Sequence, residues 1–159
     1  MEHIFSPWRY KYIASADKET GCVFCRARGG NDRDFLIVHR GDLNFIILNL
    51  YPYTSGHLMI VPYEHTDSLA AVDGRTTAEM MEMAKRAQTA LEAEYHPDGF
   101  NIGMNLGRSA GAGVADHIHL HVVPRWTGDA NFVSIVGETR VLPEDLATTY
   151  EKLKRYFGS

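Results

Sequence analysis

Three histidines stand at alternate positions near the C-terminal third of the chain, in the segment His117-Ile118-His119-Leu120-His121. Side chains of an extended strand alternate between its two faces, so a strand would place the imidazoles together and the intervening aliphatic residues in a core. A helix would scatter both sets, and the branched aliphatic residues favour the strand. Such a row of imidazoles can bind a metal ion, carry out nucleophilic or acid–base chemistry, or face water.

A metal site built from the triad alone is disfavoured by distance. Successive same-face side chains of one strand lie about 6.5 Å apart, so adjacent histidines could share an ion but the outer two would struggle to reach it. A row that merely faces water is also disfavoured, because the strict alternation follows a glycine-rich loop, Asn105–Gly113.

Nucleophilic attack on phosphorus fits the neighbouring residues better. A neutral imidazole is a competent nucleophile near physiological pH, provided that its second ring nitrogen is held as a hydrogen-bond donor. The loop Asn105–Gly113 can approach an anion closely and direct backbone N–H groups at phosphoryl oxygens. The pattern therefore predicts that the middle histidine attacks, that the flanking histidines orient it and that the loop holds the oxygens.

The strands that position these residues are predicted from short runs rich in β-branched residues and bounded by Gly, Asp, Asn or Pro. They cover residues 34–39, 43–50, 57–63, 100–106 and 117–123, with 130–136 as one further candidate. The polar stretch that extends to residue 31 predicts an irregular N-terminal arm. We expect this arm to pack through its aromatic side chains, Phe5, Trp8, Tyr10 and Tyr12.

Helices are predicted between and after these strands. A short helix begins near Thr66 or Asp67, either of which is a suitable N-cap. A long helix follows Asp73 and Gly74 and ends before Pro97, and its apolar face comprises Met80, Ala84, Ala87, Leu91 and Tyr95. A last helix begins at Pro143 and runs to about residue 157, with an apolar face of Leu146, Tyr150, Leu153 and Phe157. Together these elements predict an α+β domain with an antiparallel sheet covered by helices.

Bulk composition restricts the classes of function. The chain has 159 residues, 45% hydrophobic and 23% charged, which suits one soluble globular domain spanning residues 1–159. A net charge of -4 and a pI of about 6.0 argue against a nucleic-acid partner. No apolar run approaches the ~20 residues of a membrane span, and the N-terminus lacks the features of a secretory signal. With only two cysteines, we expect a cytoplasmic protein without a membrane partner.

The segment "HIHLHVV" resembles the signature of the histidine triad superfamily of nucleotide hydrolases and transferases. Two longer segments extend the resemblance. Residues 48–65, "LNLYPYTSGHLMIVPYEH", are similar to the strand–turn–strand of the nucleoside pocket, and residues 100–126 to the phosphate-binding strand and loop. The resemblance implies a catalytic core over residues 35–126, with an N-terminal arm over 1–31 and a C-terminal extension over 127–159. It also implies a five-stranded antiparallel sheet with one long helix and short helices, shared between the subunits of a homodimer.

Within this superfamily the chain resembles the fragile histidine triad branch and bacterial diadenosine tetraphosphate phosphorylases or hydrolases. Asn49 stands where that branch carries Asn and the Hint branch carries Asp, and "PRWTGDANF" is similar to phosphorylase-like members. The resemblance implies an enzyme that cleaves a dinucleoside polyphosphate at the α-phosphate through a nucleotidyl-histidine, which phosphate or water then resolves.

The resemblance also implies roles for individual residues. Among the catalytic residues, His119 is the nucleophile, His121 bonds the phosphate or bridging oxygen, His117 supports the arrangement, and His57 lies near the catalytic strand. The nucleotide contacts are Asn49 for the ribose, Leu50 for the base and Asn105 for phosphate, together with the loop residues Gly111, Ala112 and Gly113. Many members carry Gln or Ser in this loop as a phosphate ligand. Here Ala112 and Gly113 stand there, so backbone amides must hold the phosphate, and the second substrate is left open.

Three alternative functions stay open. One is a nucleoside phosphoramidase or general nucleotidyl hydrolase of the Hint type, against which Asn49 is a mild argument. Another is a nucleotide-binding or partner-binding module whose triad is inert. The third is a metal-dependent hydrolase that uses the triad as ligands, which would lose its activity on chelation.

Two cysteines at C-x-x-C spacing, Cys22 and Cys25, have several interpretations. They could be free thiols or a redox pair, although a redox pair normally opens a helix in a βαβ context that is not predicted here. A zinc site needs two further ligands. Some superfamily members bind a structural zinc through such cysteines, a histidine after the third strand and the first triad histidine, which implies His65 and His117 here. No organic cofactor is implied.

Overall fold

The computed structural model of the protein describes residues 21–130 and 142–158. The strands are β1 (Ile37–Arg40), β2 (Asn44–Leu48), β3 (Leu58–Pro62), β4 (Gly99–Gly103) and β5 (Leu120–Arg125). The helices are α2 (Val23–Gly29), α3 (Asp32–Phe35), α4 (Gly74–Tyr95) and α6 (Leu146–Lys154), with 3-10 turns η1 (Leu69–Ala71) and η2 (Arg108–Ala110). The candidate strand over 130–136 and the four aromatic residues of the arm fall outside the described residues.

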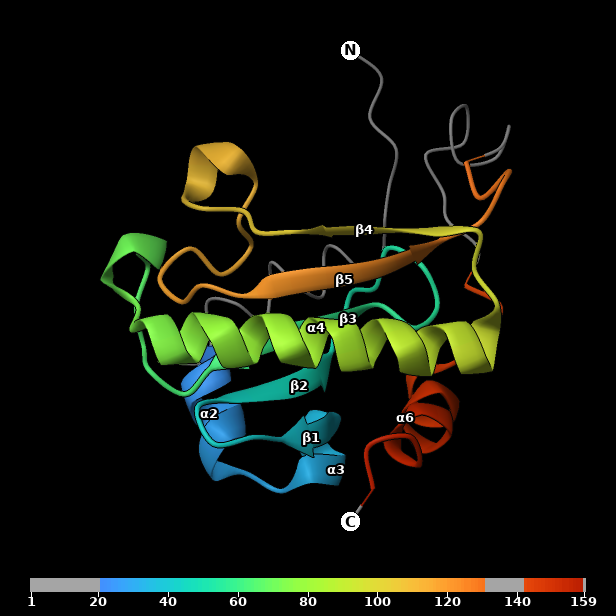
Figure 1. Ribbon diagram of the computed structural model, residues 1–159, viewed down its shortest axis with the longest axis horizontal. Coiled ribbons are helices and arrows are strands. Elements are labelled where there is room, and N and C mark those ends of the chain that lie inside the picture. Colours follow the sequence, from blue (N-terminus) through green and yellow to red (C-terminus); the bar gives the residue numbers. More distant parts are fainter. Residues whose placement is uncertain (1–20, 131–141, 159) are drawn as a thin grey trace.

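Five strands form one sheet in the described part of the chain, in the order β1-β2-β3-β5-β4 (Figure 1). Every neighbouring pair is antiparallel. The predicted α+β class with an antiparallel sheet is therefore confirmed. β5 lies between β3 and β4, so the segment that carries the triad enters the sheet at an interior position rather than at an edge.

One face of the sheet is covered by α4 and α6 (Figure 1). The long helix begins at Gly74, one residue earlier than predicted, because the Asp73 side chain accepts a hydrogen bond from the backbone N–H of Arg75 and is the N-cap. It ends at Tyr95, with His96 in the left-handed conformation as its C-cap. The predicted apolar face is confirmed in the core, which includes Met80, Ala84, Ala87 and Leu91, with Tyr95 packed against it.

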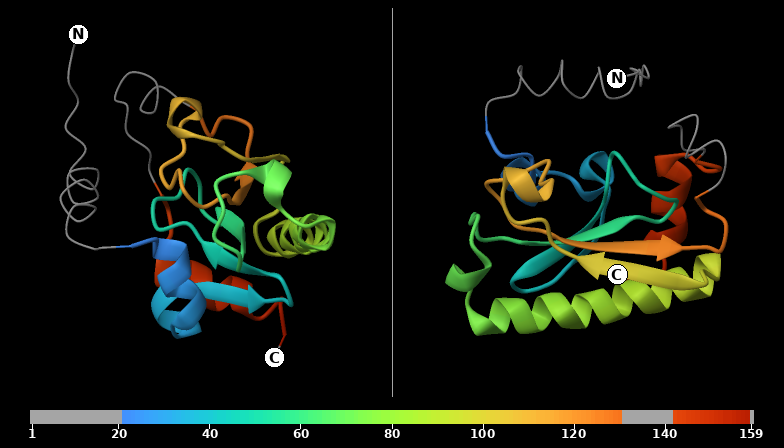
Figure 2. Two further views of the ribbon diagram at one scale, coloured as in Figure 1. Left: turned by 90° about the vertical axis from the view of Figure 1, so that its left-hand side faces the viewer. Right: turned by 90° about the horizontal axis from the view of Figure 1, so that it is seen from above.

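The opposite face of the sheet is covered by α2, which Figure 2 shows across the sheet from α4. Phe24 and Ala27 of α2 are buried there against Ile47, Met59 and Val61. The prediction of an irregular arm up to residue 31 was therefore wrong for residues 23–29. The helix has only seven residues, too few for apolar periodicity to stand out, and tertiary burial of Phe24 and Ala27 stabilises it.

Element boundaries differ from the prediction where local capping or turn chemistry decides them. β1 begins only at Ile37, because Asn31 caps α3 through hydrogen bonds from the N–H groups of Arg33 and Asp34. α6 begins at Leu146 rather than at Pro143, because Asp145 accepts the N–H of Thr148 and is the N-cap.

The short helix predicted near Thr66 is only a 3-10 turn, η1, preceded by Ser68. The Thr66 hydroxyl accepts the backbone N–H of Ser68, so it stabilises a turn before η1 instead of a helix start. None of the helices in the described part of the chain has the length and hydropathy that a bilayer crossing would require.

Candidate active site and metal-binding cluster

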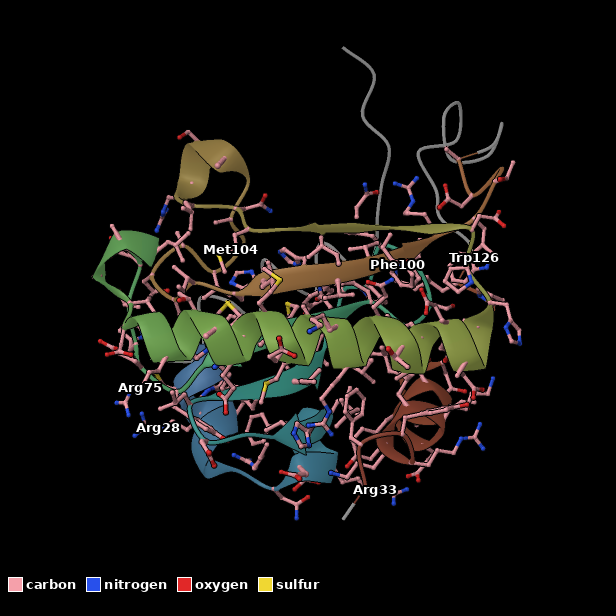
Figure 3. All side chains as sticks on the ribbon, in the orientation of Figure 1. Arg28, Arg33, Arg75, Phe100, Met104 and Trp126 are labelled. Atoms are coloured by element: carbon pink, nitrogen blue, oxygen red, sulfur yellow. The ribbon has the colours of Figure 1, made fainter. Side chains whose placement is uncertain are left out.

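The triad segment is extended, but only its last histidine belongs to a strand. β5 begins at Leu120, so the prediction of one strand over 117–123 was wrong for its first residues. The N–H of Ile118 donates to the carbonyl of Thr66, so the backbone before Leu120 does not continue the pairing with β3. Met104 and Trp126 mark opposite ends of the β4–β5 pair in Figure 3, and the triad enters at the Met104 end.

All three triad imidazoles are buried. His117 is 1% exposed, His119 5% and His121 8%, which excludes the interpretation of a row facing water. His121 pairs with Met59 of β3 and so points to the α2 side of the sheet. Phe24 of α2 lies with its ring centroid 5.4 Å from His117 and 5.0 Å from His119, so α2 covers the first two imidazoles.

His119 is held as a neutral imidazole with one free lone pair. Its Nδ1 lies 2.9 Å from the carbonyl oxygen of His117, and because a carbonyl only accepts, Nδ1 carries the proton. Nε2 therefore keeps its lone pair. Burial lowers the pKa of His119 and outweighs the opposing effect of this hydrogen bond. This is the state that a nucleophilic imidazole requires.

His57 and His121 form a second ordered pair. The backbone N–H of Tyr53 donates to His57 Nδ1 at 3.1 Å, so the ring proton of neutral His57 lies on Nε2. His57 Nε2 is 2.9 Å from His121 Nδ1, to which it donates. His121 then carries its own proton on Nε2. Burial, with a smaller contribution from His119, lowers the pKa of His121 to about 4, which keeps the ring neutral.

Asn49 forms hydrogen bonds within the loop that follows β2. Its backbone N–H donates to the carbonyl of His57 at 3.0 Å, and its Oδ1 accepts the N–H of Tyr51 at 2.9 Å. Its Nδ2 lies 3.4 Å from His57 Nδ1. The next residue, Leu50, is 52% exposed and borders a hollow of about 150 Å³ between this loop and the start of α6.

The glycine-rich loop does not present all of its predicted phosphate-binding amides. The N–H of Gly111 donates to Arg108 and that of Ala112 donates to Gly107, both within the loop. Gly107 and Gly111 have φ values of 83° and 89°, a conformation that favours glycine. The glycines at these two positions therefore permit the tight turn. In this conformation the donors expected at residues 111 and 112 are engaged, which sequence spacing alone could not reveal. The half-buried Asn105 comes two residues after Gly103, which pairs with His121.

A separate cluster gathers beside the first triad histidine: one ligand atom each from Cys22, Cys25, His65 and His117, all within 4.8 Å of one another. The distances from His117 Nδ1 are 3.3 Å to Cys22 Sγ, 3.7 Å to Cys25 Sγ and 3.2 Å to His65 Nδ1. Cys25 Sγ lies 3.3 Å from His65 Nδ1. These residues come from α2, the segment after β3 and the segment before β5.

The donor set and spacing of this cluster fit a tetrahedral zinc ion. Zinc bonds of 2.0 to 2.3 Å to nitrogen and sulfur imply ligand separations of roughly 3.3 to 3.8 Å, close to the four distances given above. His117 Nε2 lies 2.9 Å from the carbonyl oxygen of Pro62, to which it donates. The lone pair of Nδ1 therefore faces the other three ligand atoms, as metal-ligating histidines require.

Some contributors to the site carry no signal in the sequence. The N–H of Tyr53 and the carbonyl of Pro62 act through the backbone, so their residue types do not reveal them. Phe24 could have been found only by reading its spacing to Ala27 as a short buried helical face. His39 stacks on Phe157 and lies outside the triad cluster.

This fold and buried triad define a known class, and the chain belongs to the HIT domain family, whose profile matches residues 31–128. It is 40% identical over 157 residues to the AP-4-A phosphorylase of Mycobacterium tuberculosis, covering 94% of this chain and 80% of that protein. A Zn-bound histidine triad family protein from Mycobacterium smegmatis superposes with a TM-score of 0.71 at 33% identity, covering 86% of this chain and 92% of the other. A hypothetical histidine triad nucleotide-binding protein from Sulfolobus tokodaii superposes with a TM-score of 0.65 at 28% identity, covering 85% and 88%.

Proposed function

We propose that the protein is an enzyme that cleaves dinucleoside polyphosphates at the α-phosphate through a nucleotidyl-histidine intermediate. The observation that carries this proposal is the hydrogen bonding of two buried imidazoles. The contact of His119 Nδ1 with a carbonyl oxygen leaves the lone pair on Nε2 of the neutral ring. The contacts of His57 with the Tyr53 N–H and with His121 Nδ1 imply a proton on Nε2 of neutral His121. The 40% identity to a protein named AP-4-A phosphorylase supports diadenosine tetraphosphate as a substrate.

In the first step, His119 Nε2 attacks the α-phosphorus. A P–N bond forms while the bond from phosphorus to the bridging oxygen breaks, and the second nucleotide leaves as its anion. His121 Nε2–H donates to the phosphoryl or bridging oxygen and stabilises the negative charge that develops there. His119 does not lose a proton on attack, because its proton is on Nδ1 and stays in the hydrogen bond to His117.

In the second step, either an anionic oxygen of inorganic phosphate or a water that releases a proton to solvent attacks the same phosphorus. The P–N bond breaks, and its electron pair returns to His119 Nε2. Transfer to phosphate yields a nucleoside diphosphate, and transfer to water yields a nucleoside monophosphate. Because Gly111 and Ala112 donate their N–H groups within the loop, we propose that Asn105 and His121 supply the first contacts to the bound phosphate.

Product analysis tests this function. The zinc-replete protein is incubated with diadenosine tetraphosphate, with and without inorganic phosphate, and the nucleotides are separated. ADP plus ATP that forms only with phosphate establishes a phosphorylase, and AMP plus ATP a hydrolase. Folded protein that turns over neither this substrate nor a nucleoside phosphoramidate, yet binds AMP, would establish the inert binding module instead.

We also propose that Cys22, Cys25, His65 and His117 bind a structural zinc ion. The neighbouring Zn-bound structure and the four-atom cluster support this proposal. A zinc ion there supplies a cross-link rather than chemistry at the phosphate. These four residues would join α2 to the segments on either side of the site and hold His117 in place.

A homodimer is proposed as well. β4 is an edge of the sheet in the described part of the chain, and its Ile102 is 43% exposed. An unpaired edge with an exposed apolar side chain suits pairing with a second copy. Light scattering on the purified protein distinguishes a dimer from a monomer.

A further inference from the structure

The orientation of the Asn49 amide is fixed by its backbone partner. The N–H of Tyr51 can only donate, so the atom that faces it at 2.9 Å must be the carbonyl oxygen Oδ1. The amide nitrogen Nδ2 is therefore the atom that faces His57 Nδ1 at 3.4 Å. Asn49 presents a donor, and not an acceptor, to this histidine.

The same ring nitrogen also receives the N–H of Tyr53, at 3.1 Å. Two donors that converge on His57 Nδ1 exclude a proton from that nitrogen. The proton of neutral His57 is thereby confined to Nε2, which faces His121 Nδ1 at 2.9 Å. Since His121 Nδ1 must accept, neutral His121 has its proton on Nε2.

We propose that Asn49 is a positioning residue that, together with the Tyr53 N–H, sets the direction of the His57–His121 hydrogen bond and so makes His121 present an N–H to the substrate. The inference rests on the proposed function only in that the His121 N–H is taken to donate to the substrate phosphate. A ribose contact by Asn49 is compatible with it, because an amide has two N–H donors and two lone pairs and only one of each is engaged in these contacts.

The choice of an amide over a carboxylate at position 49 has a defined consequence. Aspartate has the same shape as asparagine but only accepts hydrogen bonds. A carboxylate beside His57 Nδ1 attracts a proton to that nitrogen and opposes the arrangement set by Tyr53. If that proton comes from Nε2, the His57–His121 bond reverses, and His121 then directs a lone pair at the anionic phosphate.

The test is the protonation state of the imidazoles in the Asn49→Asp variant of the full chain. Long-range ¹H–¹⁵N NMR of ¹⁵N-histidine-labelled protein reports which ring nitrogen carries the proton. The His57→Gln and His121→Gln variants assign the two spin systems. The matched control is Asn31→Asp, which adds the same charge while keeping the α3 N-cap acceptor of the hydrogen bonds from Arg33 and Asp34.

We expect a proton on His57 Nε2 and none on Nδ1 in the wild-type protein and in Asn31→Asp, and a proton on His57 Nδ1 in Asn49→Asp.

Two results would overturn the inference: a wild-type His57 with its proton on Nδ1, or an Asn49→Asp variant whose His57 and His121 protonation is unchanged. Both are read from NMR without any substrate. The absence of turnover in the wild-type protein would count against the proposed function alone, so the failure of one proposal is distinguishable from the failure of the other.

Discussion

The ring of His119, the proposed nucleophile, is anchored to the backbone of His117, with Nδ1 2.9 Å from the His117 carbonyl oxygen. The imidazole of His117 in turn belongs to the Cys22, Cys25 and His65 cluster. One residue thus contributes its side chain to the candidate metal site and its main chain to the candidate active site. Anything that displaces His117 is expected to disturb the orientation of His119.

Removal of one cysteine ligand is therefore expected to affect both stability and activity. For Cys25→Ser we expect loss of stoichiometric zinc and a drop of about 2–3 kcal/mol in the free energy of unfolding, the size of a ligand effect at about 100 times its Kd. Elemental analysis and thermal unfolding measure these two quantities. Added zinc should raise the unfolding temperature of the chelated wild-type protein but not that of the variant. Full zinc content in Cys25→Ser would contradict the site.

Replacement of the proposed nucleophile is expected to abolish turnover without abolishing binding. For His119→Ala we expect kcat to fall at least about 10³-fold, while AMP affinity changes much less, because the attacking atom acts only in the chemical steps. His96→Asn is the matched control: it removes a histidine outside the site, and asparagine tolerates the left-handed conformation that His96 adopts as C-cap of α4. Equal turnover in the two variants would support an inert triad.

How far the sequence could predict this structure depends on whether each feature is local. The start and apolar face of α4 follow from Asp73 and from a periodicity within one helix, so both could be predicted. The start of β5 could not, because it depends on the bond from Ile118 to Thr66, which are 52 residues apart. Short apolar runs identify strands, but tertiary contacts decide where the strands begin.

The features of the candidate site likewise divide into those that could be predicted and those that depend on the fold. The gathering of Cys22, Cys25, His65 and His117 was implied by the family resemblance, and the geometry brings the four together. The protonation of each imidazole could not be predicted, because it is set by backbone groups whose positions depend on the fold. The engaged amides at residues 111 and 112 were missed for the same reason, since a glycine-rich loop can direct its N–H groups inward or outward.

Acid is expected to destabilise the protein partly through His121. Its pKa falls from 6.5 to about 4 on folding because the buried ring is held neutral. The unfolded chain therefore binds more protons between these values, and stability should fall as the pH is lowered from about 6.5 towards 4. Urea unfolding of the wild type and of His121→Asn at several pH values checks this, and both proteins are kept loaded with zinc. The pH dependence should be shallower in the variant, and equal slopes would exclude His121 as a cause.

A second titrating group, Glu79, connects α4 to the turn between β1 and β2. Its Oε1 accepts the N–H of Asp42, and its Oε2 accepts the N–H of Leu43 and the Nδ2 of Asn44. Burial alone would raise the pKa of Glu79, but these hydrogen bonds outweigh it and the pKa lies below its ordinary 4.5. The stabilisation is thus present above that value and lost as the pH falls through the folded pKa.

We expect Glu79→Gln to lower the free energy of unfolding by about 1–2 kcal/mol at neutral pH. The amide replaces one carboxylate oxygen with an NH2 group, which cannot accept the N–H groups that face it. Glu82→Gln, one turn along α4, breaks only an exposed pair with Lys85 and should change the free energy by less than about 0.5 kcal/mol. The difference between wild type and Glu79→Gln should shrink below the ordinary carboxyl pKa, where protonated Glu79 also carries a donor. Denaturant unfolding across this range measures it. A difference that stays constant into acid would show that Glu79 acts through packing and not through its charge.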